Sequence, residues 1–265
     1  MCKGGNFPCY AYRLANGRLK ERYLANPNVA PRYEEDGARF NLYEDLHDPF
    51  YPRFWSDRCN RSDMVPGRSP KGIFVCDMGD LFGIGVPEEW THRVLDRCKD
   101  MPQHRFYLLT KQPQNLTRFS PFPDNCWVGV TATDTGMLLQ ACSSLEYPVE
   151  AKVKYLSIEP FLGWSFNWNE SYLINAFKRA GINWIIIGQQ TPINKKTKPQ
   201  IEWVQEIVEA ADKAGVAVFL KDNLNPMFAE NDCKLFKEHR DTLFTFKDFE
   251  SDSKTRWHLR QEIPK

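Results

Sequence analysis

A short series of polar residues, each placed just after an expected core strand, is the part of this sequence best suited to chemistry. In folds that alternate strands with helices, the loops after the carboxyl ends of parallel strands form the reaction face. Scattered carboxylates, lysines and amides there would meet in one pocket, as in an enzyme, and Asp80, Lys111, Glu159 and Lys221 should point into it. The full series is Asp77, Asp80, Lys111, Thr131, Thr133, Glu159, Gln189, Gln190 and Lys221.

Four members of the series are the expected catalytic residues. Glu159 directly follows the apolar run VKYLSI. A carboxylate that points into a barrel mouth must either form an ion pair or take part in function, so Glu159 is the strongest single candidate. Asp80 belongs to CDMGDLF and either serves the site or caps the next segment. Lys111 either pairs with a ligand carboxylate or is an exposed turn residue. Lys221 neutralises Glu159 or a bound phosphate, unless its pairing is purely structural.

The remaining members are expected to bind a cofactor. Asp77 would bind a ribose hydroxyl, a cation or the substrate, or would cap a segment. Gln189 and Gln190 carry neutral amides, which bind hydroxyls or a base edge but cannot act as a general base. Thr131 and Thr133 follow the strand WVGV. The five histidines have no metal-ligand spacing, and no phosphate-binding or nucleophile-elbow motif follows an expected strand.

The elements that position these residues alternate between strand and helix periods. Consecutive apolar positions, as in VAVFL, are typical of strands buried on both faces. The expected strands are 40–43, 72–76, 106–109, 127–130, 153–158, 184–187 and 216–220. The expected helices are 9–24, 49–59, 88–101, 112–119, 134–145, 172–180 and 201–214, with a further one at 232–239.

This alternation predicts a (β/α) barrel of the TIM type over residues 1–224, followed by a partly helical or irregular extension, 225–265. Seven strands are one short of a closed barrel. We expect the first strand to lie upstream, with Met1 an internal methionine of a longer protein. Strand 216–220 should then have an unpaired edge or be covered by the C-terminal tail.

Composition limits the function classes. The net charge of +1 gives no general attraction to nucleic acid or membrane, although five basic residues between Arg13 and Arg32 form either a basic patch or a solvated helix face. No apolar run approaches the ~20 residues of a membrane span. Eight scattered cysteines, several of them within apolar elements, fit a reducing, cytoplasmic location.

Seven segments occur in an order and at spacings that resemble a known family. They are CYAYRL, FVCDMGDLF, LLTKQP, WVGVTATD, YLSIEPFLG, WIIIGQQ and VFLKDN. The chain resembles the phage-associated three-cysteine-motif proteins, an uncharacterised family similar to radical S-adenosylmethionine barrel enzymes. The resemblance covers roughly residues 2–223.

The resemblance implies a four-iron cluster and S-adenosylmethionine as cofactors. Cys9, followed by Tyr-Ala, matches the last of the family's three cysteines, and Cys2 matches the second. The first has no counterpart in this chain, and six residues separate Cys2 from Cys9 where two are usual. Cys76, at an expected strand end, is the next candidate for a third ligand. Gln189 and Gln190 stand where the family usually has Gly-Glu.

Two functions from different classes follow. The first is a radical S-adenosylmethionine-like iron–sulfur enzyme, whose substrate we expect to be a nucleic acid or nucleotide by analogy with phage association alone. The second is a non-redox barrel that binds a ligand, a nucleic acid or a partner protein without turnover. Iron and sulfide analysis after anaerobic expression separates them.

Overall fold

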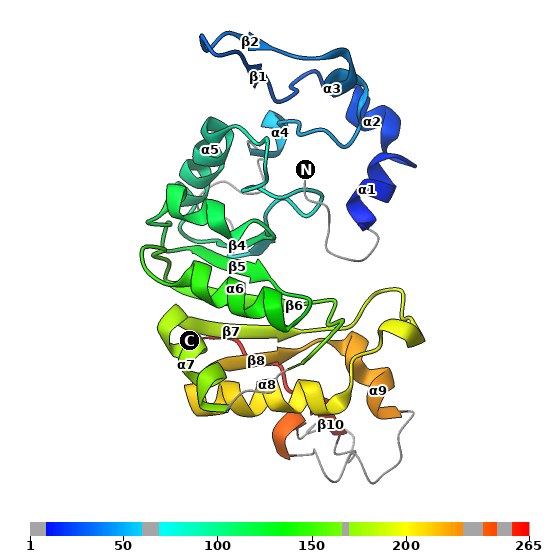
Figure 1. The fold of residues 1–265 in the computed structure, drawn as a ribbon, viewed down its shortest axis with the longest axis vertical. Helices are drawn as coiled ribbons and strands as arrows, with labels where there is room; N and C mark the ends of the chain where they lie inside the picture. Colours follow the sequence, from blue (N-terminus) through cyan, green and yellow to red (C-terminus); the bar gives the residue numbers. More distant parts are fainter. Residues whose placement is uncertain (1–8, 60–68, 166–169, 230–240, 248–255, 265) are drawn as a thin grey trace. The chain divides into compact units, whose positions relative to one another are not determined.

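The structure, a computed structural model, describes residues 9–59, 69–165, 170–229, 241–247 and 256–264 (Figure 1). The chain groups into two compact units. The first consists of Met1–Val128 with Glu150–Lys152, and the second of Gly129–Val149 with Val153–Lys265.

Six strands form one sheet, in the order β3-β4-β5-β6-β7-β8. Their bounds are Gly72–Phe74 (β3), Arg105–Thr110 (β4), Cys126–Thr131 (β5), Val153–Ile158 (β6), Ile182–Ile187 (β7) and Ala217–Leu220 (β8). Pairing is parallel, as between β6 and β7 and between β7 and β8. Each strand lies beside its neighbour in the chain, which is the order of a (β/α) barrel. This confirms a mixed α/β fold with a partial barrel-type sheet.

Helices follow these strands at close to the expected positions. They are α5 (Glu88–Lys99), the 3-10 helix η2 (Pro113–Phe119), α6 (Thr135–Leu145), α7 (Glu170–Ala180) and α8 (Ile201–Ala214). Asp134 caps α6 as expected, because its carboxylate accepts the amide of Met137 at 2.9 Å. Gly215 ends α8 in the left-handed conformation, with φ 76°.

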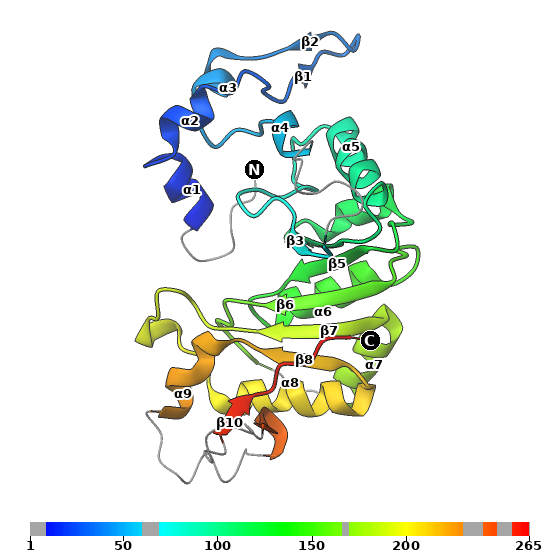
Figure 2. The same cartoon turned by 180° about the vertical axis from the view of Figure 1, so that it is seen from behind.

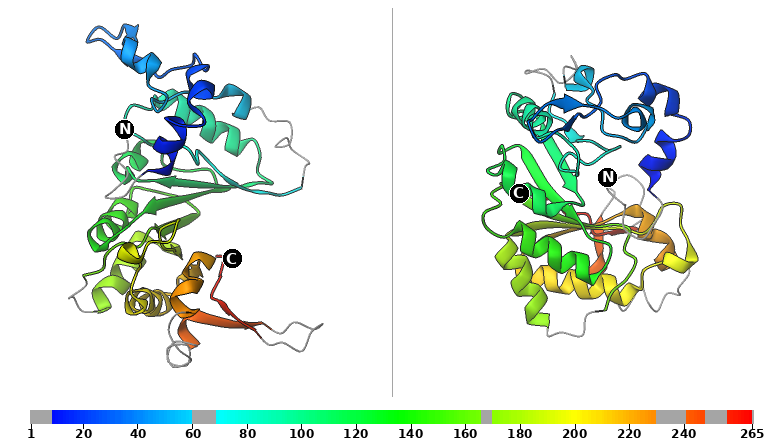
Figure 3. Two further views of the ribbon diagram at one scale, coloured as in Figure 1. Left: turned by 90° about the vertical axis from the view of Figure 1, so that its right-hand side faces the viewer. Right: turned by 45° about the horizontal axis from the view of Figure 1, so that its top comes forward.

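In the second unit, α6, α7 and α8 lie side by side (Figure 3). Alternate residues of the strands form the core with these helices, since successive side chains point to opposite faces of a sheet. Leu156, Ile185 and Val218 are fully buried, as are Val204 and Ile207 of α8. The other face of the same strands carries the residues from which the site is built.

The single helix expected over residues 9–24 is two short helices, α1 (Tyr10–Ala15) and α2 (Lys20–Leu24). The break lies at Asn16, whose side-chain amide donates to the Tyr12 carbonyl at 3.0 Å. The chain then turns, and the amide of Leu19 bonds to the Leu14 carbonyl at 3.0 Å. The Asn16 side chain thus shares the Tyr12 carbonyl with the Asn16 backbone amide, which donates to it at 2.9 Å, and the helix ends there.

The helix expected over 49–59 is also wrong, because only α4 (Ser56–Cys59) is helical. Two prolines in the segment lack an amide donor. The rest of it hydrogen-bonds residues 26–30 instead, including Ala30 N to Pro52 O and Phe54 N to Asn28 O, both at 2.9 Å.

The strand expected at 40–43 does not join the parallel sheet. Phe40 ends β2 (Arg39–Phe40), which pairs antiparallel with β1 (Arg32–Tyr33). Tyr43 begins the helix α3 (Tyr43–His47). Two-residue strands of this kind hold a turn, and they add nothing to the six-stranded sheet.

The C-terminal tail covers the edge of β8, which is the second of the two alternatives expected from the sequence (Figure 2). After η4 (Asp222–Leu224) and α9 (Asn225–Ala229), the chain forms the antiparallel pair β9 (Phe244–Lys247) and β10 (Arg256–Leu259). It then runs beside β8, with Leu220 N to Arg260 O at 2.7 Å and Glu262 N to Val218 O at 2.8 Å. The helix expected at 232–239 lies outside the described residues.

Candidate functional site

The site is built at the carboxyl ends of β6, β7 and β8, all in the second unit. The strand register pairs Ile158 with Ile187, and Ile187 with Leu220. Continuing each strand by one residue brings Glu159, Gly188 and Lys221 into one row. The register is held by Gly188 N to Ile158 O at 3.0 Å and Lys221 N to Ile187 O at 2.9 Å.

The absence of a side chain on Gly188 lets Glu159 and Lys221 meet across the middle strand. Strands two apart are separated by roughly 10 Å, so both side chains must reach over the glycine. A Cβ at Gly188 would lie 2.8 Å from Glu159 Oε1 and 3.0 Å from Lys221 Cδ. The resulting ion pair, Lys221 Nζ to Glu159 Oε2, is 2.6 Å long.

Asn223 is a fourth member of this cluster. Its side-chain amide donates to Glu159 Oε1 at 3.0 Å and to the Gln189 carbonyl at 2.8 Å, and its Oδ1 accepts the Gln189 amide at 3.2 Å. The Gln189 side chain is buried and donates to the Asn223 carbonyl. Each oxygen of Glu159 therefore has one partner, and the loops after β7 and β8 are fastened together. Glu159, Gly188, Gln189, Lys221 and Asn223 are called the rim cluster below.

The two threonines expected to bind a cofactor, Thr131 and Thr133, both lie in the second unit, but their hydroxyl groups have different surroundings. Ala132 N bonds to Ser157 O at 2.9 Å, which sets Thr131 beside Ser157, one row below Glu159. The Thr131 side chain is 2% exposed, and its hydroxyl has no hydrogen-bond partner among the described residues. Thr133 donates to Met137 Sδ at 3.1 Å, so its hydroxyl is already engaged.

Asp80 and Lys111 belong to the first unit, where Asp80 braces a turn. Its Oδ2 accepts the Thr110 hydroxyl at 3.0 Å and the Lys111 amide at 2.8 Å, and its Oδ1 accepts the Phe82 amide at 3.1 Å. Both carboxylate oxygens are thus used locally. The structure brings Asp80 to the backbone of Lys111, and it separately brings Glu159 to Lys221. That the four share one cavity stays a prediction.

The expected metal ligands lie at the start of the chain. Cys2 lies outside the described residues. Cys9 is half-buried and precedes α1, where its Sγ accepts the Tyr12 amide at 3.5 Å. Nearby, the carbonyl of Asp77 accepts the Tyr10 hydroxyl. Burial, and then the charge of Asp77, raises the pKa of Tyr10.

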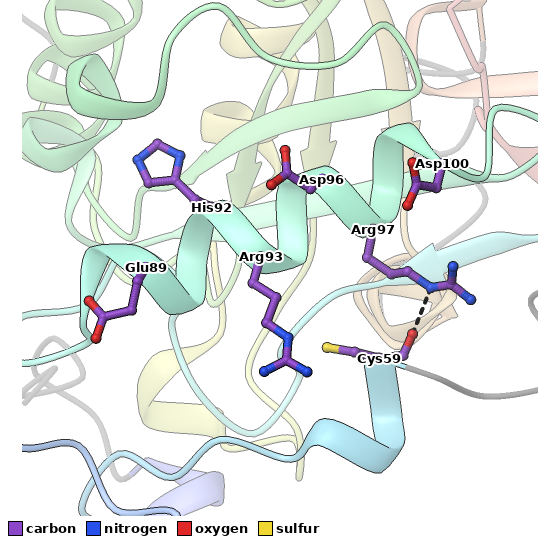
Figure 4. Close-up of a pocket in the computed structure, with 7 residues that line it drawn as sticks. All are labelled: Cys59, Glu89, His92, Arg93, Asp96, Arg97 and Asp100. Atoms are coloured by element: carbon purple, nitrogen blue, oxygen red, sulfur yellow. Dashed lines mark hydrogen bonds between the residues drawn. The ribbon is translucent and has the colours of Figure 1, made fainter.

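Two hollows on the described surface lie apart from the rim cluster. One, of about 540 Å³, runs along α5 in the first unit. Figure 4 shows that His92 and Asp96 point to one side of α5, whereas Arg93 and Arg97 point to the side of Cys59. These groups do not converge on one point. The other, of about 380 Å³, is lined by Asp134, Trp164 and Trp203 among others in the second unit.

The rim cluster is chemically available because it is partly open to solvent. The Glu159 side chain is 25% exposed and that of Lys221 is 40% exposed. The lysine ammonium has three donor hydrogens, so it can hold Glu159 and still donate to an anionic group of a ligand. A half-exposed ion pair is worth only about 0–1 kcal/mol, so a ligand can displace it at low cost.

Fold and site together define a parallel α/β protein whose polar rim stands at the carboxyl ends of its strands. The chain belongs to DUF5131, a family of proteins of unknown function, whose profile matches residues 2–241. Neither the curated proteins nor the solved structures gave a match. Among the described residues, no helix is long and apolar enough to cross a membrane.

Sequence reasoning missed Gly188 and Asn223 as parts of the site. Both belong to conspicuous segments of the sequence, WIIIG and VFLKDN. A glycine that ends an otherwise apolar strand is a signal for close approach of a neighbouring side chain. The role of Asn223 had no comparable signal, because it depends on β7 and β8 being neighbours.

Proposed function

We propose that this protein is a radical S-adenosylmethionine-type iron–sulfur enzyme related to the phage-associated three-cysteine-motif proteins. The proposal is supported by the seven ordered segments and by the barrel-type strand order. The observation that carries it is the rim cluster, since polar residues from successive strand ends are the layout of a (β/α) barrel enzyme. Nucleic acid or a nucleotide is the proposed substrate class.

Of the two proposed ligands of the iron–sulfur cluster, one lies among the described residues. A four-iron cluster with one open iron needs three thiolates. Cys9 is described, Cys2 is not, and the described residues contain no group of three His, Cys, Asp or Glu side chains that could hold a metal ion. The described donors therefore do not fit a cluster by themselves. Cys2 and Cys9 remain the proposed ligands.

The residues of the rim cluster have roles that do not depend on a metal. Lys221 would bind an anionic group of the substrate, and Glu159 would accept a hydrogen bond from a hydroxyl or an amine. Asn223 holds Glu159 in place while Lys221 exchanges partners. The unpaired Thr131 hydroxyl offers one further polar group beneath them.

The test is iron and sulfide analysis of protein expressed and purified without oxygen. We expect iron and sulfide in the wild type and a severe loss of both in Cys9→Ala, because Cys9 is one of the two proposed thiolate ligands. Cys142→Ala is the matched control, because Cys142 is 2% exposed within α6 and burial raises its pKa to about 12. Folded wild-type protein without iron or sulfide would overturn the proposal.

A second function, a non-redox binding barrel, is favoured by one observation: the rim cluster is complete without a metal. The two functions differ in turnover. With a strong reductant, the enzyme should cleave S-adenosylmethionine to 5′-deoxyadenosine, whereas a binding barrel should leave it intact.

A further inference from the structure

The loop between β7 and α8 concentrates positive charge beside the rim cluster. Residues 189–200, QQTPINKKTKPQ, contain Lys195, Lys196 and Lys198 and no acidic residue. The whole chain carries a net charge of only +1, so this excess is local. The loop begins at Gln189, which is itself part of the rim cluster. Its charge therefore lies at the carboxyl end of β7, where a substrate would approach.

Hydrogen bonds give this loop a defined shape. Lys196 N bonds to Asn194 Oδ1 at 3.0 Å and Thr197 N to Asn194 O at 3.1 Å, which forms the 3-10 helix η3 (Lys195–Thr197). The Thr197 hydroxyl donates to Gln190 Oε1 at 2.8 Å. The lysines are thus presented on a turn that is fastened to the rim, which limits the entropy lost on binding.

The lysines at the tip are accessible. Lys195 and Lys196 are exposed, and within the described ranges neither forms an ion pair. Ile193, beside them, is 51% exposed. Two other surface cations of this unit form ion pairs, Lys213 with Glu170 and Arg179 with Glu146.

The basic residues near the start of the chain are a weaker alternative. Arg32 makes a two-pronged contact with Asp45, at 2.6 and 2.8 Å, and this hydrogen bonding lowers the pKa of the carboxyl group. Arg22 lies over the Trp55 ring, 5.6 Å from its centroid. Arg13 and Arg18 remain exposed. Two of the five cations are therefore already engaged within the first unit.

We propose that the β7–α8 loop, through Lys195 and Lys196, binds the phosphate backbone of a nucleic acid and guides it to the rim cluster. Neighbouring lysines without interspersed carboxylates match a polyanion of regularly spaced phosphates. The side-chain NH2 group of Gln190, whose Oε1 is held by Thr197, can then donate to a base edge. The inference rests on the proposed function and deepens it, because it narrows the substrate class to a nucleic acid and names the docking surface.

The experiment measures binding of a short fluorescein-labelled single-stranded oligonucleotide to the full chain by anisotropy, over a series of salt concentrations. Lys195→Glu/Lys196→Glu should weaken binding about tenfold or more and reduce the salt slope by about 1 to 2. The control is Lys152→Glu/Lys178→Glu, with the same charge change. Both control lysines are exposed and precede the opposite, amino ends of β6 and β7. The control should bind almost as the wild type does.

Four results would overturn the inference. Three of them are no binding by the wild type, equal loss of binding in both double variants, and equal competition by polyglutamate, which would indicate an acidic protein partner. The fourth is a loss of oligonucleotide binding in Arg13→Glu/Arg18→Glu but not in Lys195→Glu/Lys196→Glu, which would place the docking surface in the first unit. Iron content and circular dichroism are measured on the same samples. Iron without oligonucleotide binding refutes the docking surface alone, and binding without iron refutes the enzyme alone.

Discussion

On one face of the sheet in the second unit, the same strands carry two layers of side chains, and the two layers have different roles. The lower layer is aromatic: Tyr155, Trp184 and Phe219 pack with ring centroids 5.8 and 6.0 Å apart. The upper layer is the rim cluster, half-open to solvent. Each layer contains a glycine that makes room for a neighbour. Gly129 lies under the Tyr155 ring, and Gly188 lies under the ion pair. In both layers a glycine provides the space for a neighbouring side chain. That space serves ring packing in the lower layer and exchangeable polar contacts in the upper layer.

Among the predicted changes, Gly129→Ala should have the largest effect on the free energy of unfolding. Its Cβ would lie 2.2 Å from Tyr155 Cζ, and the buried ring has nowhere to move. We expect the free energy of unfolding to fall by about 3 kcal/mol, measured by urea denaturation. Gly163→Ala is the control, because the atom nearest to its added Cβ would be Asp134 Cβ at 3.9 Å. Gly129→Ala with Tyr155→Leu should recover part of the loss. Unchanged stability in Gly129→Ala would refute the packing role.

Asp80→Ala tests whether a polar residue of the first unit is structural. The change leaves the Thr110 hydroxyl and the amides of Phe82 and Lys111 without their acceptor. We expect a loss of about 2 kcal/mol in unfolding free energy. Asp124→Ala, at an exposed position, should change stability by no more than about 0.5 kcal/mol. If Asp80→Ala instead keeps full stability and abolishes turnover, Asp80 belongs with Glu159.

Gly188→Ala should cost less stability and yet disrupt the upper layer. Its Cβ meets the flexible ends of Glu159 and Lys221, which can move aside for about 1 kcal/mol. Once separated from Glu159, the Lys221 amine should be acetylated faster, as read by mass spectrometry. The exposed Lys178 serves as internal reference and should react at an unchanged rate. Equal rates at Lys221 in both proteins would show that the pair does not depend on the glycine.

The smallest predicted energy is the coupling energy between Glu159 and Lys221 in their ion pair. A double-mutant cycle with Glu159→Gln and Lys221→Met should give a coupling energy of at most about 1 kcal/mol, because both side chains are partly exposed. Added salt should reduce it further. A coupling energy well above this range would mean that the pair holds the fold together and is not free to exchange with a ligand.

Local sequence was a good guide where the pattern was long and regular. Strand 153–158 and helix 201–214 begin and end as predicted, because an apolar period and a capping residue act over neighbouring positions. It failed at 9–24 and 49–59. There the competing contacts come from the Asn16 side chain and from a segment more than twenty residues away, at 26–30.

The sequence by itself determined the alternation of strands and helices and the placement of Glu159 and Lys221 at strand ends, since both follow from local periodicity. Only the tertiary structure decided that these two residues meet over Gly188, that Asn223 fastens them, and that the tail covers β8. The physical reason is that strand neighbours and their register are set by packing between distant segments. No local pattern records which side chain will stand in the next strand.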